Sequence, residues 1–246
     1  MKVAVCASAC FHAENNRDKT LLKAAGLDVR RMSAQSRFAV AGILPFRERR
    51  LPPETAVFFG TDFGSRNVFD TMRRNMRQGF AKPLDFLAHL HNAPVFHVCA
   101  ALGLSGVSVV EAADNRPHNW LKPLFQAMLH LNACGGYALA GWCLETPDAD
   151  GTGAGGGSLW LLLSAEETGA AELELQQAEA FAMPSADRLH VLSDGEGNNF
   201  LQQATGLFSA LQAGQVWQLP PPLPDTVWRL RVHSLLPFAV PSAPQI

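Results

Sequence analysis

The sequence lacks an excess of charge of either sign, and it lacks any long hydrophobic run. Its 246 residues carry 20 Lys and Arg against 22 Asp and Glu, which gives a formal net charge of −2. No broad basic excess indicates a nucleic-acid partner, and no apolar run approaches the roughly 18 residues of a membrane span. The apolar stretch near the start is short and is soon broken by polar residues, which is typical of a first strand rather than of a signal peptide.

Cysteine is scarce and odd in number. The five thiols stand in scattered apolar contexts, at Cys6, Cys10, Cys99, Cys134 and Cys143. This pattern favours reduced thiols in a cytoplasmic protein over a disulfide scaffold. Their spacing fits no common zinc pattern, so we expect no metal and no cofactor.

What remains is an ordinary globular composition, with 48% hydrophobic and 17% charged residues. β-rich apolar runs predict strands over residues 3–9, 56–60, 107–112, 137–145, 158–165 and 226–235, with 171–183 as a further candidate. Helical spacing of apolar residues predicts helices over residues 37–44, 68–80, 94–104, 117–134 and 198–214. Strands that alternate with helices predict an α/β fold with a mixed, largely parallel sheet and helices on both faces.

One low-complexity stretch interrupts this alternation. Residues 146–157 end in five glycines within the seven positions from Gly151 to Gly157, and they predict a flexible surface loop. The stretch lacks the Lys-Ser/Thr ending of a P-loop and runs into a strand rather than a helix, so phosphate binding is not expected there.

Three stretches occur in a recognisable order. They are RRMSAQSRFAVAG (30–42) followed by FFGTDFGSRNVFDTM (58–72), then HLHNAPVFHVCAALGLSGVSVVEA (89–112), then YALAGWCLE (137–145). Together they resemble the amino-terminal half of a β-ketoacyl synthase with the thiolase-type fold. As a short separate chain, the sequence resembles the chain-length-factor subunits of aryl polyene type II polyketide synthases. The resemblance implies a single half-synthase domain over 1–246, in which 158–246 is either a continuation or a separate cap.

The resemblance also locates the nucleophile of an active condensing enzyme, a Cys that follows the strand after GL-x-G. A thiol at a helix amino-terminus has a lowered pKa and lies near backbone N–H groups that hold an oxyanion. Here that position falls on Asn115, or on Asp114 if the register shifts by one, and neither side chain forms a thioester. Locally, either residue suits a helix N-cap, with Pro117 in the first turn. The family's HGT-type and NSFGFGG-type histidine segments do not occur, so the resemblance argues against independent condensation.

By the same resemblance the chain is a non-catalytic subunit of a heterodimer with a full-length β-ketoacyl synthase, served by an acyl carrier protein. The expected interface strand consists of Val107, Ser108, Val109, Val110, Glu111 and Ala112. Bulky side chains that would limit the partner's acyl tunnel are Phe69, Met72, Met76 and Phe125. An acidic carrier would dock on basic side chains, for which the candidates are Arg73, Arg74 and Arg77.

Two alternatives belong to other functional classes. One is a degenerate thiolase-fold acyltransferase or hydrolase that acts on its own through Cys99 or a histidine. Its nearest histidine, His97, is two residues away on an expected helix, and that spacing does not place both side chains on one face. The other alternative is a homodimeric, non-enzymatic protein that keeps only the fold.

Overall fold

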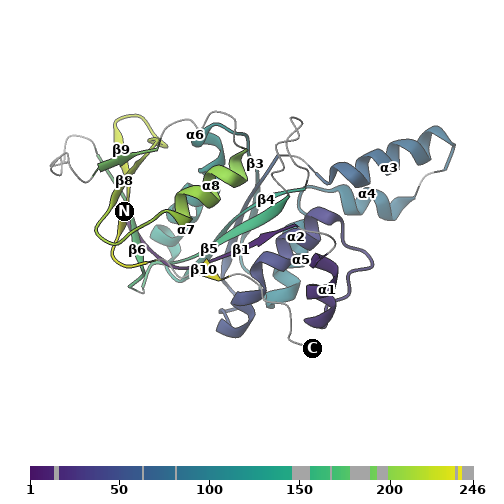
Figure 1. Cartoon of the computed structure of the whole chain (residues 1–246), viewed down its shortest axis with the longest axis horizontal. Helices are drawn as coiled ribbons and strands as arrows, with labels where there is room; N and C mark the ends of the chain where they lie inside the picture. The colour runs from purple at the N-terminus through teal and green to yellow at the C-terminus, as the bar shows by residue number, and fades with distance from the viewer. Residues whose placement is uncertain are drawn as a thin grey trace.

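The computed structural model describes residues 1–13, 17–62, 64–80, 82–145, 156–166, 168–177, 189–192, 199–235 and 238–239. One mixed sheet runs through them in the order β3-β2-β4-β5-β1-β6-β9-β8-β7, with β10 beside β1 (Figure 1). The strands are β1 Lys2–His12, β2 Ala56–Thr61, β3 Ser108–Ala112, β4 Tyr137–Leu144, β5 Gly157–Ser164, β6 Ala171–Gln177, β7 Leu189–Val191, β8 Val216–Leu219, β9 Thr226–Val232 and β10 Phe238–Ala239. Strands from before and after the glycine-rich stretch therefore share one sheet.

The strand pairing divides the sheet into regions. β2 is parallel to both β3 and β4, β1 is parallel to β10, and β7 is parallel to β8. Antiparallel pairs join β4 to β5, β5 to β1, β1 to β6, β6 to β9 and β9 to β8. Among the strands that the structure describes, β3 pairs only with β2 and forms one edge of the sheet.

Helices cover both faces of the sheet, as the sequence predicts. On one face lie α1 Arg17–Ala24, α2 Ala34–Ile43 and α5 Ala93–Leu102, and on the other lie α6 Pro117–Trp120, α7 Lys122–Cys134 and α8 Phe200–Ser209. The 3-10 helix η1, Leu44–Arg49, follows α2 directly. α3 Arg66–Arg77 and α4 Pro83–His89 pack on each other and extend away from the body as an arm, which we call the α3–α4 arm (Figure 1).

The central strands are buried on both faces, which explains their nearly continuous apolar sequence. Every residue of β2 and of β5 is buried, and so are all residues of β4 except the first. Gly141 of β4 lies opposite Trp160 of β5, and a Cβ at Gly141 would overlap the indole ring. The glycine therefore makes room for the largest side chain of the neighbouring strand.

The structure corrects some element boundaries. The single helix expected over 117–134 is two helices, α6 and α7, separated at Leu121. The helix expected over 198–214 ends at Ser209. The candidate strand at 171–183 is β6 as far as Gln177, and its last six residues lie outside the described ranges. The glycine-rich loop expected over 146–157 lies outside the described residues except for its last two glycines, the second of which begins β5.

The sequence patterns do not predict α1, α4, η1, β8 and β10, which are short or polar elements. The sequence of α1, RDKTLLKA, is mostly polar, and Leu21 and Leu22 are its two large apolar side chains. Two adjacent leucines show no helical spacing, so the pattern does not predict a helix there. No helix in the described ranges is long and apolar enough to cross a membrane.

Candidate functional site

A cavity of about 470 Å³ lies where the parallel strands β2, β3 and β4 end. Ligand sites in α/β proteins commonly lie beyond the carboxyl ends of such strands. The cavity is lined by Asp62 after β2, by Ala112–Arg116 after β3, by Leu144 of β4, and by Asn119, Lys122, Asn199 and Phe200. The segment that holds Asp114 and Asn115 therefore borders the main candidate site.

Asn115 is exposed, and its polar atoms face helix α8. Its Oδ1 accepts a hydrogen bond from the backbone N–H of Phe200 at 3.0 Å, and its backbone oxygen accepts one from Nε2 of Gln203 at 3.0 Å. Phe200 is the first residue of α8, whose opening N–H groups have no partner within the helix. A carboxamide here thus fastens α8 to the segment after β3.

The expected N-cap role for Asp114 or Asn115 is wrong. Helix α6 has Arg116 as its N-cap and Pro117 in its first turn, and no side chain caps it. Asp114 instead accepts hydrogen bonds from the backbone N–H of Arg116 at 2.9 Å and from Nδ2 of Asn119 at 2.7 Å. The sequence could show that these residue types suit a cap, but not which backbone N–H group each one reaches.

Asp114 is held in its charged form. The guanidinium of Arg116 donates to its carboxylate and lowers the pKa of Asp114 to about 2, chiefly through this side-chain hydrogen bond. A carboxylate with so low a pKa is a poor general base near neutral pH. Asp114 therefore supplies fixed negative charge at the rim of the cavity.

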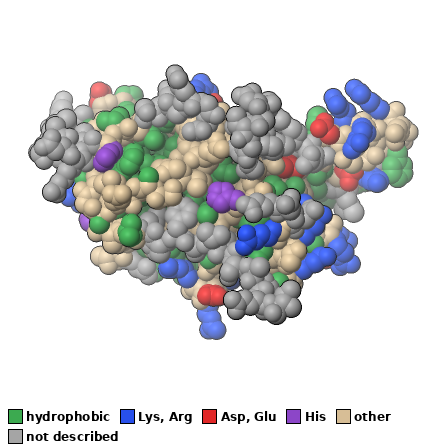
Figure 2. Space-filling model, in the orientation of Figure 1, with side chains coloured by type: hydrophobic (Ala, Val, Ile, Leu, Met, Phe, Trp, Pro, Cys, Tyr) green, Lys and Arg blue, Asp and Glu red, His purple; other side chains and the backbone are tan. Residues whose placement is uncertain are grey.

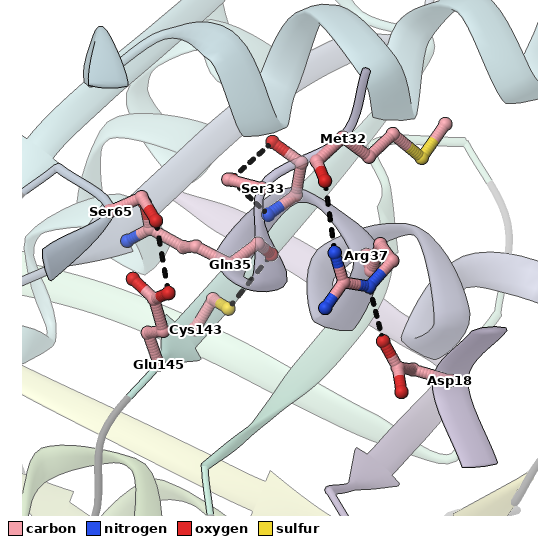
Figure 3. Close-up of polar contacts among 9 residues, drawn as sticks. Asp18, Met32, Ser33, Gln35, Arg37, Ser65, Cys143 and Glu145 are labelled. Carbon is pink, nitrogen blue, oxygen red and sulfur yellow. Dashed lines mark hydrogen bonds and ion pairs between the residues drawn. The ribbon is translucent and has the colours of Figure 1, made fainter. Parts of the chain in front are cut away.

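Buried polar contacts lie at the ends of β2 and β4, on the side of the sheet that α2 covers (Figure 3). Ser65 Oγ donates to Glu145 Oε1 at 2.9 Å, and Gln35 of α2 donates through Nε2 to the hydroxyl of Thr61. The Cys143 thiol points to the backbone oxygen of Gln35 at 3.5 Å. These contacts tie α2 and the start of the α3–α4 arm to the strand ends, and the sequence analysis missed them because the partners are far apart in the chain.

The buried thiol in this network is unsuited to nucleophilic attack. Burial raises the pKa of Cys143 well above its ordinary value, and the carboxylates of Glu145 and Asp62 add to the effect. Only a thiolate attacks a thioester at a useful rate. Cys143 therefore acts as a small core side chain between the sheet and α2.

Cys99 and His97, the candidate pair of the acyltransferase alternative, lie on α5 and are half-buried. Burial raises the pKa of Cys99 and lowers the pKa of His97, so both groups favour their neutral forms. A nucleophilic pair needs the opposite arrangement, a thiolate beside a base that accepts its proton. Within the described residues, no group of three or more His, Cys, Asp or Glu side chains is placed to hold a metal ion.

The residues expected to limit an acyl tunnel occupy two separate elements. Phe69, Met72 and Met76 lie on α3 in the arm, where Phe69 contacts His89 of α4 at 5.1 Å between ring centroids. Phe125 lies on α7 in the body and packs edge-on against Trp228 at 5.9 Å. Their role as a tunnel limit stays a prediction.

The three candidate arginines for carrier docking share the exposed surface of α3. Arg73 lies 3.7 Å from Asp70, and Arg74 donates to Thr71 at 3.4 Å. Figure 2 shows Lys and Arg side chains gathered at the end of the molecule formed by the α3–α4 arm. The arm also exposes apolar side chains, among them Phe69, Met76, Phe80, Phe86 and Leu87.

The strand expected at a partner interface lies at the sheet edge. Its residues are half-buried or exposed, and the preceding Val107 is 51% exposed. Two hydrogen bonds, Val57 N–H to Val107 O at 2.8 Å and Ala113 N–H to Thr61 O at 2.7 Å, fix which backbone groups face β2. Since these groups alternate along a strand, the N–H and C=O groups of Ser108, Val110 and Ala112 face outward.

Beside β3 lies a second cavity of about 720 Å³, which the sequence analysis missed. Its lining comes from β3, α6, α7 and the segment around β9: Glu111, His118, Leu121, Lys122, Phe125, Gln126, Leu129, Pro220–Pro222 and Trp228. We call it the α7 groove. The sequence feature that could have indicated this groove is Glu111, the one charged residue of β3.

Comparison with known proteins gives no match in sequence, because neither a protein-family model nor a curated protein matches the chain. Solved structures match it in fold. A chain of the ketosynthase ApeO in complex with its chain length factor ApeC, from Xenorhabdus doucetiae, matches with a TM-score of 0.58 at 14% identity over 94% of this chain and 99% of that chain.

Two further structures agree. A chain of AntDE:AntF, a type II polyketide synthase acyl-carrier protein in complex with its ketosynthase, matches with a TM-score of 0.63 at 11% identity over 93% of this chain and 98% of that chain. Ketosynthase twelve of the bacillaene polyketide synthase from Bacillus amyloliquefaciens matches with a TM-score of 0.51 at 13% identity over 86% of this chain and 57% of that chain. The chain therefore has the ketosynthase-like thiolase fold.

Proposed function

We propose that this chain is a non-catalytic, chain-length-factor-type subunit that pairs with a full-length β-ketoacyl synthase and shapes the elongation of acyl chains. The observation that carries the proposal is the carboxamide of Asn115 at the position where the resemblance expects a nucleophilic thiol, already engaged by the backbone of Phe200. A side chain that cannot form a thioester leaves condensation to the partner.

The matched structures support this assignment by what they contain. One holds a ketosynthase with its chain length factor, and another holds an acyl-carrier protein with its ketosynthase. In both, nearly the whole of the matched chain aligns with nearly the whole of this one, so the chains are of similar length. By the sequence resemblance, we propose that the complex makes polyene, polyketide or fatty-acid-like products in the cytoplasm. An acyl carrier protein would deliver the extender unit.

The edge strand β3 is the proposed contact with the ketosynthase. An unpaired edge presents backbone donors and acceptors that bind readily to another strand. The α3–α4 arm is the proposed dock for the carrier protein, because it presents Arg73, Arg74 and Arg77 next to exposed apolar side chains.

The decisive experiment combines co-purification with a backbone substitution. The chain is co-expressed with the full-length ketosynthase that the proposal expects a neighbouring gene to encode, and the complex is isolated through a tag on the ketosynthase. Val110→Pro removes an N–H that faces outward, so it should abolish the complex while β3 stays paired to β2. Val110→Ala is the matched control, because it keeps the N–H and removes most of the side chain.

A second measurement concerns chemistry. The purified chain, incubated with acyl-carrier-protein or coenzyme A thioesters, should gain no acyl mass by mass spectrometry. Acylation of the isolated chain, or a failure of the wild-type chain to form a complex with the ketosynthase, would contradict the proposal.

A further inference from the structure

The edge strand β3 carries one charged side chain, Glu111, whose carboxylate forms no ion pair with the described residues. Glu111 faces α7 and accepts a hydrogen bond from Nε2 of Gln126 at 2.6 Å. In the described part of the chain no cation comes within ion-pair distance of its carboxylate, although Lys122 and His118 line the same α7 groove. A half-buried carboxylate on an edge strand is therefore left to solvent or to a partner.

The amide of Gln126, which donates to Glu111, has a buried oxygen without a donor in the part of the chain that the structure describes. A carboxylate only accepts hydrogen bonds, so Gln126 must present its NH₂ group to Glu111, and its Oε1 then points elsewhere. This Oε1 is buried and has no hydrogen-bond partner among the described residues. The amide of Gln126 thus holds the Glu111 carboxylate in place and leaves its own oxygen without a donor. A buried acceptor without a donor is destabilising, so holding the carboxylate at this edge has a cost.

A second copy of the same strand does not supply that donor. In an antiparallel pair that uses all five residues of β3, Val110 lies opposite its own copy and Glu111 lies opposite Val109. The two Glu111 side chains then share one face as diagonal neighbours, about 7 to 8 Å apart between backbone positions, which is unfavourable for like charges. Self-pairing would place only a valine side chain opposite each carboxylate.

We propose that Glu111, held in place by Gln126, receives a Lys or Arg side chain from an extended strand of an unlike partner, and that it opposes pairing of the chain with itself. A guanidinium or ammonium group donates to the carboxylate oxygens and neutralises their charge. Backbone bonds along β3 supply attachment, while this polar pair supplies the choice of partner. The inference rests on the proposed pairing through β3 and adds the chemistry of the partner strand.

The first test uses the isolated chain and sedimentation equilibrium. The wild-type chain is expected to self-associate at least about tenfold more weakly than Glu111→Val, which removes the charge from the edge. Val110→Pro added to Glu111→Val should return the chain to the monomer, because it removes an outward N–H. Glu48→Gln, an equal change of charge at an exposed residue of η1, should leave self-association unchanged.

A mixing experiment keeps the test independent of any single variant. Glu111→Lys should not self-associate, but an equimolar mixture with the wild-type chain should form a one-to-one dimer. Circular dichroism and thermal melting establish that each variant is folded. Wild-type self-association as tight as that of Glu111→Val, or the absence of a mixed dimer, would overturn the proposal.

The partner complex separates this inference from the function on which it rests. With the ketosynthase, Glu111→Val should weaken the complex at least about tenfold, and Glu48→Gln should not. If Glu111→Val binds as tightly as the wild type while Val110→Pro does not bind, the role of Glu111 fails and the pairing through β3 stands. If the wild-type chain itself does not bind, the proposed function fails.

Discussion

Asn115 and Phe200, which are 85 positions apart in the chain, are joined by a hydrogen bond of 3.0 Å between a side-chain oxygen and a backbone N–H. The bond satisfies the first N–H of α8 from a distant segment of the chain. The N-cap residue Asn199 satisfies the N–H of Gln202 in the same first turn. The segment after β3 is therefore fixed to α8 at the rim of the 470 Å³ cavity.

Replacement of Asn115 by alanine should lower the free energy of unfolding by about 1 kcal/mol, the usual cost of losing a side-chain bond to a helix amino-terminus. Urea denaturation measures the change. Asn132→Ala, on an exposed position of α7, is the control and should change stability by less than about 0.5 kcal/mol. Equal effects of the two substitutions would show that the bond to Phe200 contributes nothing.

Local patterns account for most of the strands in the sheet. β2, β4 and β5 are recognisable in sequence because each is a short apolar run buried on both faces. The break between α6 and α7 was missed because the apolar spacing continues across it. A signal was present in Pro123, which lacks an N–H and clashes with the preceding turn of a continuous helix.

The site was less predictable because its contacts join distant segments. The residue types at 114 and 115 indicated that a thioester cannot form, and this depends only on side-chain chemistry. Nothing near Asn115 in the sequence indicates Phe200, and nothing near Glu145 indicates Ser65, 80 positions away. Such pairs are set by the sheet order, which the alternation of elements does not determine.

The ion pair of Asp114 and Arg116 should make a small, pH-dependent contribution to stability. The pKa of Asp114 is lowered to about 2 in the folded chain, against about 3.9 for an unfolded aspartate. Its contribution is therefore present above about pH 4 and is lost as the pH falls through about 2. Because its side chain is 42% exposed, solvent screening limits the contribution to about 0.5 kcal/mol.

Asp114→Asn tests this through urea unfolding at pH 7 and at pH 2.5. The variant should be less stable than the wild type at pH 7, and the difference should shrink at the lower pH. In an Arg116→Gln background the same substitution should have little effect at either pH, since its main partner is gone. A difference that grows as the pH falls would contradict the assignment.

Gly141 should not tolerate a methyl group. An added Cβ would overlap the ring of Trp160, which cannot move freely because it stacks on Phe59 at 5.4 Å and donates to Ala39 O at 3.1 Å. Gly141→Ala should lower the free energy of unfolding by about 2 to 3 kcal/mol, a typical cost of overpacking a core. The melting temperature reports the change.

Gly206 is the matched control for that substitution. It lies in helix α8, and a Cβ there meets nothing within 4 Å. Gly206→Ala should raise the free energy of unfolding by up to about 1 kcal/mol, because alanine favours the helix. If Gly141→Ala were as stable as Gly206→Ala, the close packing of β4 on Trp160 would be wrong.

Thiol labelling at pH 8 separates the subunit from the acyltransferase alternative. Cys134 is exposed, Cys6 and Cys99 are half-buried, and Cys10 and Cys143 are buried. Burial also raises the pKa values of Cys10, Cys99 and Cys143, which reduces their thiolate fractions. The folded chain should therefore show one fast thiol toward a disulfide reagent, and all five thiols should react in denaturant.

Cys134→Ser should remove the fast phase, because the only freely accessible sulfur among these five is then gone. A fast phase that survives Cys134→Ser and disappears in Cys99→Ser would instead identify Cys99 as an activated nucleophile.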